Sequence, residues 1–239
     1  MGAAEPTPTA NRSPWGLGHV VVGFLLAEAA VVVALVVFSA VGADAELDDL
    51  SLEAIAVLQA ALWLGTLGVP AWLVRVRGVR WSDFGWGFRR RDTISGLLIG
   101  IGTQLVAVPL LYFPLLLLLD DLDVAEPARD LVDKATGTGV VLLVLVVVVG
   151  APVVEEIFYR GLALRALESR MRPGLALVLS SLLFAVVHLQ VTQFPALMMF
   201  GLVAGRLAQK DDRLGRCIWA HVGFNATTTV ILLLDVPSM

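Results

Sequence analysis

Long apolar stretches recur along this chain and constrain its fold more than any other feature. Between Val140 and Val149 every residue is Val or Leu. Of the 239 residues 58% are hydrophobic and only 16% are charged, whereas soluble domains carry about 25% charged residues. Each crossing of a bilayer needs about 20 apolar residues in a helix, and the alternating pattern of a membrane β-barrel is not visible. The sequence therefore predicts an all-α, polytopic transmembrane helical bundle.

About seven spans are expected within a single transmembrane domain that covers residues 15–239, after a disordered cytoplasmic tail at 1–14. The predicted spans are 20–43, 54–74, 93–119, 138–158, 174–191, 194–209 and 217–234. The fifth and sixth are short and are separated only by Leu189 to Gln193, so a re-entrant pair is an alternative for them.

The distribution of basic residues predicts the orientation. In the seven-span arrangement all Lys and Arg except Arg129 and Lys134 fall on one side, and acidic loops at 44–49 and 120–123 fall on the other. The positive-inside rule then places the N-terminus in the cytoplasm and the C-terminus outside. We expect a multi-pass protein of a bacterial plasma membrane. Residues 80–91 mix aromatic residues with arginines and are predicted to lie at the level of the lipid headgroups.

Ionisable side chains inside the predicted spans are few. Each needs a partner or a task, because insertion near the bilayer centre costs about 2.5–3.5 kcal/mol. Glu156 and Arg160 are four residues apart, so they can form an ion pair on one helical face. Glu155 points away from that pair and is left as the free carboxylate. Glu28 has no evident task, and contact with lipid or with another helix is its default interpretation.

The same spacing of four occurs twice more, in Phe184 with His188 and in His221 with Asn225. Taken singly, an intramembrane His or Asn can simply hydrogen-bond two helices together, and a Glu–Arg pair at a helix end can be a solvated salt bridge. Taken together, a carboxylate, two imidazoles and a carboxamide can activate water and stabilise an oxyanion. An active site is therefore expected between spans 4, 5 and 7.

Three motifs occur in order: Glu-Glu-x-x-x-Arg at 155–160, Phe-x-x-x-His at 184–188 and His-x-x-x-Asn at 221–225. This set resembles the CPBP family of intramembrane proteases, which includes the CAAX-processing endopeptidase and bacterial Abi-like relatives, and the resemblance covers residues 138–234. It implies that Glu155 is the general base and that His188 positions the attacking water or shares its proton. It also implies that His221 and Asn225 form the oxyanion hole, with Glu156, Arg160 and Phe184 in support.

The resemblance further implies an endopeptidase that acts on membrane-associated or CAAX-like peptide or protein substrates, with membrane lipid and no nucleic acid as a partner. No cofactor is favoured. Zinc bound by Glu155, His188 and His221, with an open fourth position, is the alternative, but the sequence lacks His-Glu-x-x-His, and Asn225 suits an oxyanion better than a metal. We therefore expect a metal-free, glutamic-type mechanism.

Other functions remain open at this stage. A nucleophilic pair of Cys217, the only cysteine, with His221 is conceivable, although Cys is a common small residue in buried helices. A proton-coupled transporter would need a use for Glu28 and the two histidines, but no inverted repeat is visible. A non-catalytic scaffold or immunity protein of the same family would not need the carboxylate of Glu155.

Chain lengths raise one conflict about depth. Glu155 and His188 are each about 16 residues, or about 24 Å of helix, from a turn near Arg172, whereas His221 comes only five residues after Arg216. We expect the fourth helix to continue past the membrane surface through Arg165, so that the site lies near the cytoplasmic boundary. A separation of Glu155 and His221 above about 10 Å would contradict this expectation.

Overall fold

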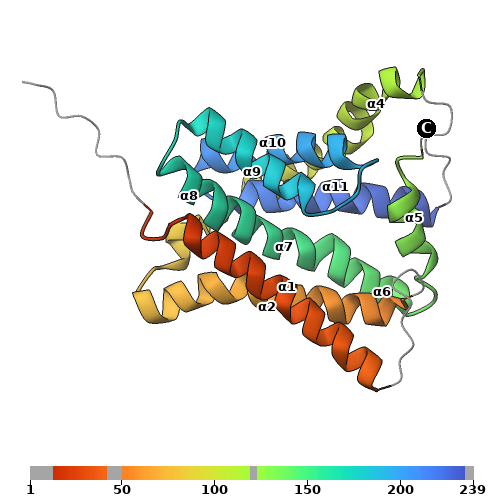
Figure 1. The fold of residues 1–239 in the computed structure, drawn as a ribbon. Helices are drawn as coiled ribbons and strands as arrows, with labels where there is room; N and C mark the ends of the chain where they lie inside the picture. Colours follow the sequence, from red (N-terminus) through yellow and green to blue (C-terminus); the bar gives the residue numbers. More distant parts are fainter. Residues whose placement is uncertain (1–12, 42–49, 119–122, 235–239) are drawn as a thin grey trace, which may run out of the picture.

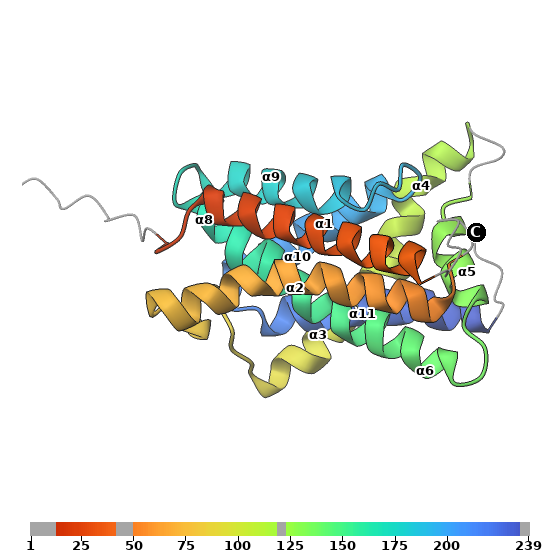
Figure 2. The ribbon, with the colours of Figure 1, turned by 60° about the horizontal axis from the view of Figure 1, so that its bottom comes forward.

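The computed structural model describes residues 13–41, 50–118 and 123–234, which form helices joined by turns (Figures 1 and 2). Within these ranges there is no β-strand. The all-α prediction is confirmed for the described part of the chain. Most of the predicted tail at 1–14 and most of the two acidic loops lie outside the described residues.

Within the described ranges, four helical rods are long and apolar enough to cross a membrane. The first two are α1 (Leu17–Ala40) and α2 (Leu52–Arg77). The third runs from Arg90 to Leu116 through α3 (Arg90–Gly102), η3 (Thr103–Ala107) and α4 (Val108–Leu116). The fourth, called here the 139–168 helix, comprises α6 (Gly139–Leu143), η4 (Val144–Gly150), α7 (Ala151–Glu155), η5 (Glu156–Leu164) and α8 (Arg165–Glu168). Such rods are those of an integral membrane protein.

The remaining elements are a 3₁₀ turn, η2 (Trp81–Phe84), and the helices α5 (Glu126–Asp133), α9 (Pro173–Val186), α10 (Phe194–Asp211) and α11 (Gly215–Leu233). Helix α9 has only 14 residues and ends five residues before the predicted limit of span 5. Leu189 follows it with a positive φ of 53°, a backbone conformation that cannot continue a right-handed helix. Seven membrane crossings therefore remain a prediction.

The 139–168 helix lies in the middle of the bundle and packs against α1, α2, α9, α10 and α11. Around it α1 pairs with α2, α9 with α10, and α3 with α11. Glycines allow two of these close approaches. Gly65 of α2 lies against the backbone of Ala27, and Gly100 of α3 lies against the carbonyl of Ala220 in α11. The packing of α3 thereby sets the position of α11 beside the central helix.

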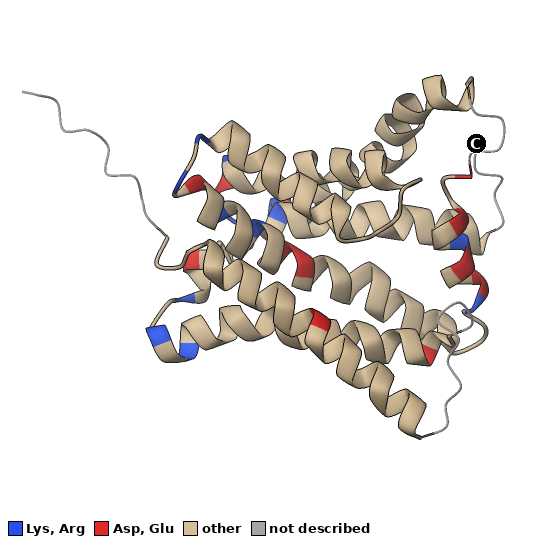
Figure 3. Ribbon diagram, viewed as in Figure 1, with Lys and Arg blue, Asp and Glu red and all other residues tan. Residues whose placement is uncertain are grey.

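Charge separates along the long axis of the bundle (Figure 3). Basic residues gather at the end where α1 begins and α2 ends, whereas the opposite end around α5 is mainly acidic. This separation agrees with the sequence pattern on which the predicted orientation rests. The N-in, C-out orientation itself stays a prediction.

The segment between α2 and α3 packs against the bundle more closely than its sequence suggested. Phe84 is completely buried and stacks on Trp15, with ring centroids 4.3 Å apart. Trp81, Trp86 and Phe88 remain exposed. Only these exposed rings are available for lipid headgroups, so the segment serves as core as well as surface.

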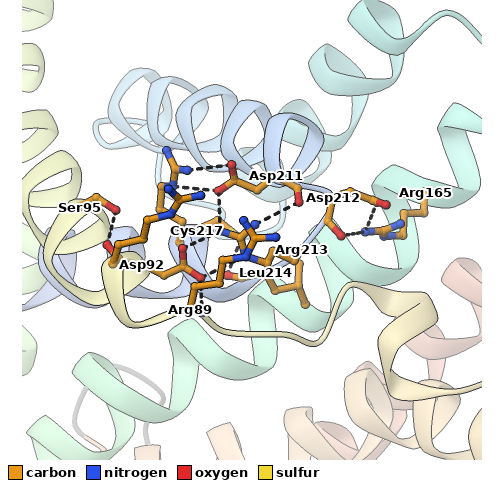
Figure 4. Close-up of polar contacts among 11 residues, drawn as sticks. Arg89, Asp92, Ser95, Arg165, Asp211, Asp212, Arg213, Leu214 and Cys217 are labelled. Carbon is orange, nitrogen blue, oxygen red and sulfur yellow. Dashed lines mark hydrogen bonds and ion pairs between the residues drawn. The ribbon is translucent and has the colours of Figure 1, made fainter.

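A polar clamp, made of Asp92, Arg165, Asp212 and Arg213, fixes the loop between α10 and α11 (Figure 4). Asp92 is fully buried and accepts hydrogen bonds of 3.1 and 2.7 Å from Nε and Nη2 of Arg213. These bonds raise the pKa of the Arg213 guanidinium. Arg165 of the 139–168 helix pairs with the Asp212 carboxylate at 2.8 Å. The start of α11 is thus tied to both α3 and the central helix.

Candidate active site

The centre of the site is a buried ion pair on the 139–168 helix. Nη1 of Arg160 donates to Oε1 of Glu156 at 2.8 Å, and the two side chains are 1% and 0% exposed. The predicted pairing of these two residues is confirmed. The pair lies in η5, a π-helical segment, and such segments often occur at functional sites. Because the charges neutralise each other, Glu156 can remain ionised away from water.

His221 of α11 lies between the two adjacent glutamates. Its Nδ1 is 2.8 Å from Oε1 of Glu156, and its Nε2 is 3.8 Å from Oε2 of Glu155. The second distance is too long for a direct hydrogen bond. The Glu155 side chain keeps 15% of its surface exposed whereas Glu156 has none. Glu155 is therefore the glutamate of this pair that a water molecule can reach.

The hydrogen bonds of His221 decide which ring nitrogen carries a proton. The Glu156 carboxylate only accepts hydrogen bonds, and it also accepts one from Arg160. Nδ1 of His221 must therefore carry the proton. Nε2 can then donate only if the ring is the imidazolium.

Two aromatic rings enclose these charges. The Arg160 guanidinium carbon lies 4.5 Å from the ring centroid of Phe184, and the His221 ring lies 4.6 Å from that of Phe200. Phe184 and Phe200 are completely buried. The expected supporting position of Phe184 is therefore observed. Phe200 was not singled out from the sequence, because a Phe in an apolar helix carries no signal that separates it from ordinary core.

His188 lies beyond the end of α9, in a turn, and not on the helical span that was predicted. Its Nδ1 bonds to the carbonyl of Phe184 at 2.7 Å, and its ring meets that of Phe184 edge-on at 4.8 Å. A carbonyl oxygen only accepts, so Nδ1 carries the proton and Nε2 is left with a lone pair. His188 thus contacts Phe184, whose ring also contacts Arg160.

Asn225 follows His221 by one turn of α11. Its Nδ2 donates to the carbonyl of Val147 at 2.8 Å, in the π-helical segment η4. This contact uses one of its two amide protons and leaves the other available. The contact ties α11 to the central helix in a second place, after the one between His221 and Glu156.

Cys217, the only cysteine of the chain, lies one turn before His221 and is completely buried. Its Sγ donates to the carbonyl of Leu214 at 3.1 Å, as small buried helix residues commonly do. The geometry gives Cys217 a packing position and no access for a substrate.

The depth conflict seen in the sequence has a structural solution. The 139–168 helix continues to Glu168, as predicted, and the α10–α11 loop docks beside Arg165 instead of at the helix end. Glu155 precedes Arg165 by ten residues and His221 follows Asp212 by nine, which is about 15 and 14 Å of helix. Counted from this docking point, Glu155 and His221 reach the same depth, and their nearest charged atoms are 3.8 Å apart. Because Gly23 lies against Phe158, this depth is near the middle of α1 and not near the helix end, where the sequence suggested it.

Among the described residues, no group of three or more His, Cys, Asp and Glu side chains is arranged to hold a metal ion. Glu155, His188 and His221, the residues named for a zinc site, do not form such a group. This arrangement does not fit the three-ligand zinc site.

Residues 137–227 match the family model described as type II CAAX prenyl endopeptidase Rce1-like. The match includes the 139–168 helix, α9, α10 and most of α11, and therefore all seven predicted site residues. No curated protein and no solved structure matches the chain.

Proposed function

Because this chain belongs over residues 137–227 to the CAAX-protease (CPBP) family, we propose that it is an intramembrane endopeptidase of glutamic type. Its substrates would be membrane-associated or CAAX-like peptides and proteins. The observation that carries the proposal is His221, held between a buried, paired glutamate and an accessible one. Such a trio supplies both a base and an electrophile.

Glu155 is the proposed general base. Its carboxylate is partly exposed and lacks the ion pair that holds Glu156. A water molecule beside it can lose a proton to the carboxylate while its oxygen attacks the scissile carbonyl carbon.

His221 is the proposed electrophile. Since its Nδ1–H is committed to Glu156, the ring can donate to an oxyanion only through a protonated Nε2. Glu156 and Arg160 then act on the reaction by holding that imidazolium in place. The free amide proton of Asn225, one turn further along α11, is the proposed second donor to the oxyanion.

His188 is the proposed relay for the proton that Glu155 takes from the attacking water. Its Nδ1–H is fixed by the Phe184 carbonyl, so the lone pair on Nε2 is free to accept a proton. The proton can then pass to the leaving amine when the C–N bond breaks. The rings of His188 and His221 both contact the ring of Phe184.

The proposal contains no metal step, because the residues that would hold zinc do not form a ligand set. Every proton transfer above uses groups of this chain and one water molecule. Metal dependence is open to direct measurement on chelator-washed protein.

Comparative proteomics of membranes that carry wild-type protein or Glu155→Gln tests the function. We expect at least one membrane protein to accumulate uncleaved in Glu155→Gln only. Glu53→Gln, which removes an exposed carboxylate at the far end of α2, should match the wild type. If no protein differs while a cellular phenotype of the deletion is restored by Glu155→Gln, the chain acts as a non-catalytic scaffold and the proposal is wrong.

A further inference from the structure

Glu28 is an ionisable residue that the proposed mechanism does not use. It lies near the middle of α1, eleven residues from Leu17 and twelve from Ala40. Its side chain is exposed, between Leu25 and Val32, which are 60% and 57% exposed. No hydrogen bond or ion pair is found for it among the described residues. A carboxylate at this depth in a membrane is costly, so a function is expected to compensate for that cost.

Glu28 lies at nearly the same depth as Glu155. Helix α1 and the 139–168 helix run in opposite directions (Figure 1), and Gly23 lies against the ring of Phe158. Glu28 is five residues after Gly23 on α1. It therefore lies level with the residue five before Phe158 on the antiparallel helix, which is Val153. Glu28 and Glu155 thus differ by about two residues in depth, which is about 3 Å.

Glu28 also lies on the side of α1 away from α2. Leu26 and Ala27 are the α1 residues that meet Gly65 of α2. Successive helix residues are rotated by about 100°, so Leu26 and Glu28 lie on opposite sides of Ala27. Tyr159, the residue after Phe158, interacts electrostatically with both Glu28 and Glu155. Tyr159 therefore lies near both carboxylates.

We propose that Glu28 binds a Lys or Arg side chain of the peptide substrate and so selects a basic residue close to the scissile bond. An exposed anion beside a cleavage site is matched in charge by a cation on the molecule that enters the site. This inference rests on the proposed endopeptidase function and specifies its substrate class.

A second copy of this chain is the less suitable partner. In the described spans, basic residues lie near the helix ends, as Figure 3 shows, except Arg160, which is buried. A neighbouring copy therefore offers no exposed cation at the depth of Glu28. A substrate peptide can carry a Lys or Arg at any position. That side chain can form an ion pair with Glu28 while the peptide backbone lies near Tyr159.

The test uses prenylated CAAX reporter peptides cleaved by the full chain in proteoliposomes. Four peptides each carry one Lys at a different position upstream of the prenylated Cys, and a fifth carries norleucine at all four positions. We expect wild-type protein to cleave one Lys peptide at least tenfold better in kcat/KM than the norleucine peptide, through a lower KM. Glu28→Gln should abolish this preference and leave cleavage of the norleucine peptide unchanged, whereas Glu53→Gln should retain the preference.

Charge exchange gives the converse result. Glu28→Lys should prefer the peptide in which Glu replaces the selected Lys. Two results would overturn the role of Glu28 while leaving the endopeptidase function intact. One is wild-type cleavage with no preference for Lys at any position, and the other is a Lys preference that persists in Glu28→Gln. If wild-type protein cleaves no peptide at all, the CAAX form of the proposed function fails and the inference fails with it. Concentration-dependent association that disappears in Glu28→Gln, with equal effects on all peptides, would assign Glu28 to self-association instead.

Discussion

Replacing Arg160 alone should strongly lower the free energy of unfolding. Replacing Glu156 as well should restore most of that free energy but not the activity. Arg160→Met deletes the guanidinium but keeps an apolar chain of similar length. It leaves the Glu156 carboxylate buried and ionised, with His221 as its remaining partner. The substitution also removes the hydrogen bond of 3.3 Å that Arg160 donates to the carbonyl of Gly201. The single substitution therefore creates an uncompensated buried charge.

The size of this effect follows from the burial of the pair. Both side chains are at most 1% exposed, and breaking such a pair on one side costs about 3–5 kcal/mol. Replacing both partners with uncharged groups of similar volume is often close to neutral. Glu156→Gln/Arg160→Met should accordingly recover most of the lost stability. It should still be slower than wild type by a factor on the order of 10²–10⁴, because an amide cannot stabilise the His221 imidazolium.

The assay combines reversible unfolding in mixed micelles, followed by circular dichroism, with cleavage of a prenylated reporter peptide. Wild type, Arg160→Met, Glu156→Gln and the double variant form a complete double-mutant cycle. A double variant as unstable as Arg160→Met would refute the account of the buried pair. A double variant with wild-type cleavage would refute the role of Glu156 in holding His221.

The other predictions concern packing, the cysteine and metal. Gly100→Ala should destabilise the protein by about 1–3 kcal/mol, because a Cβ there would meet the carbonyl of Ala220 in α11. By contrast, Gly102→Ala, where a Cβ meets nothing within 4 Å, should stabilise it by up to about 1 kcal/mol; equal effects in an unfolding titration would contradict the close α3–α11 contact. Cys217→Ala should keep reporter cleavage within about threefold of wild type, since Sγ donates to the Leu214 carbonyl and a truncation of this size costs little; an inactive variant would point to a thiol nucleophile. Washing the active protein with chelator should leave the cleavage rate unchanged, and loss of activity together with one zinc per chain would show a metalloprotease.

Local features of the site could be predicted from the sequence because they depend on helical spacing alone. Glu156 and Arg160 pair because four residues bring side chains to one face. The continuation of the central helix past Arg160 followed from chain lengths. The two glutamates diverge as expected, yet they reach opposite nitrogens of one imidazole rather than two separate surfaces.

Features that depend on tertiary packing could not be predicted in this way. The end of α9 before His188 involves a positive φ at Leu189, a residue type that rarely adopts it. The π-helical segments η4 and η5 have no recognised local signal in these apolar residues. The position of α11 depends on Gly100 and on Asp92, which binds Arg213 just before α11. Both Gly100 and Asp92 are far from α11 in sequence.

The rate of reporter cleavage by Glu155→Gln tests the central claim most directly. Gln keeps the size of the side chain but cannot take a proton from water, and loss of a general base costs on the order of 10²–10⁴-fold in rate. The account predicts a loss of that size in kcat, with KM and the unfolding transition close to those of wild type. A folded Glu155→Gln variant that cleaves the reporter at the wild-type rate would contradict it.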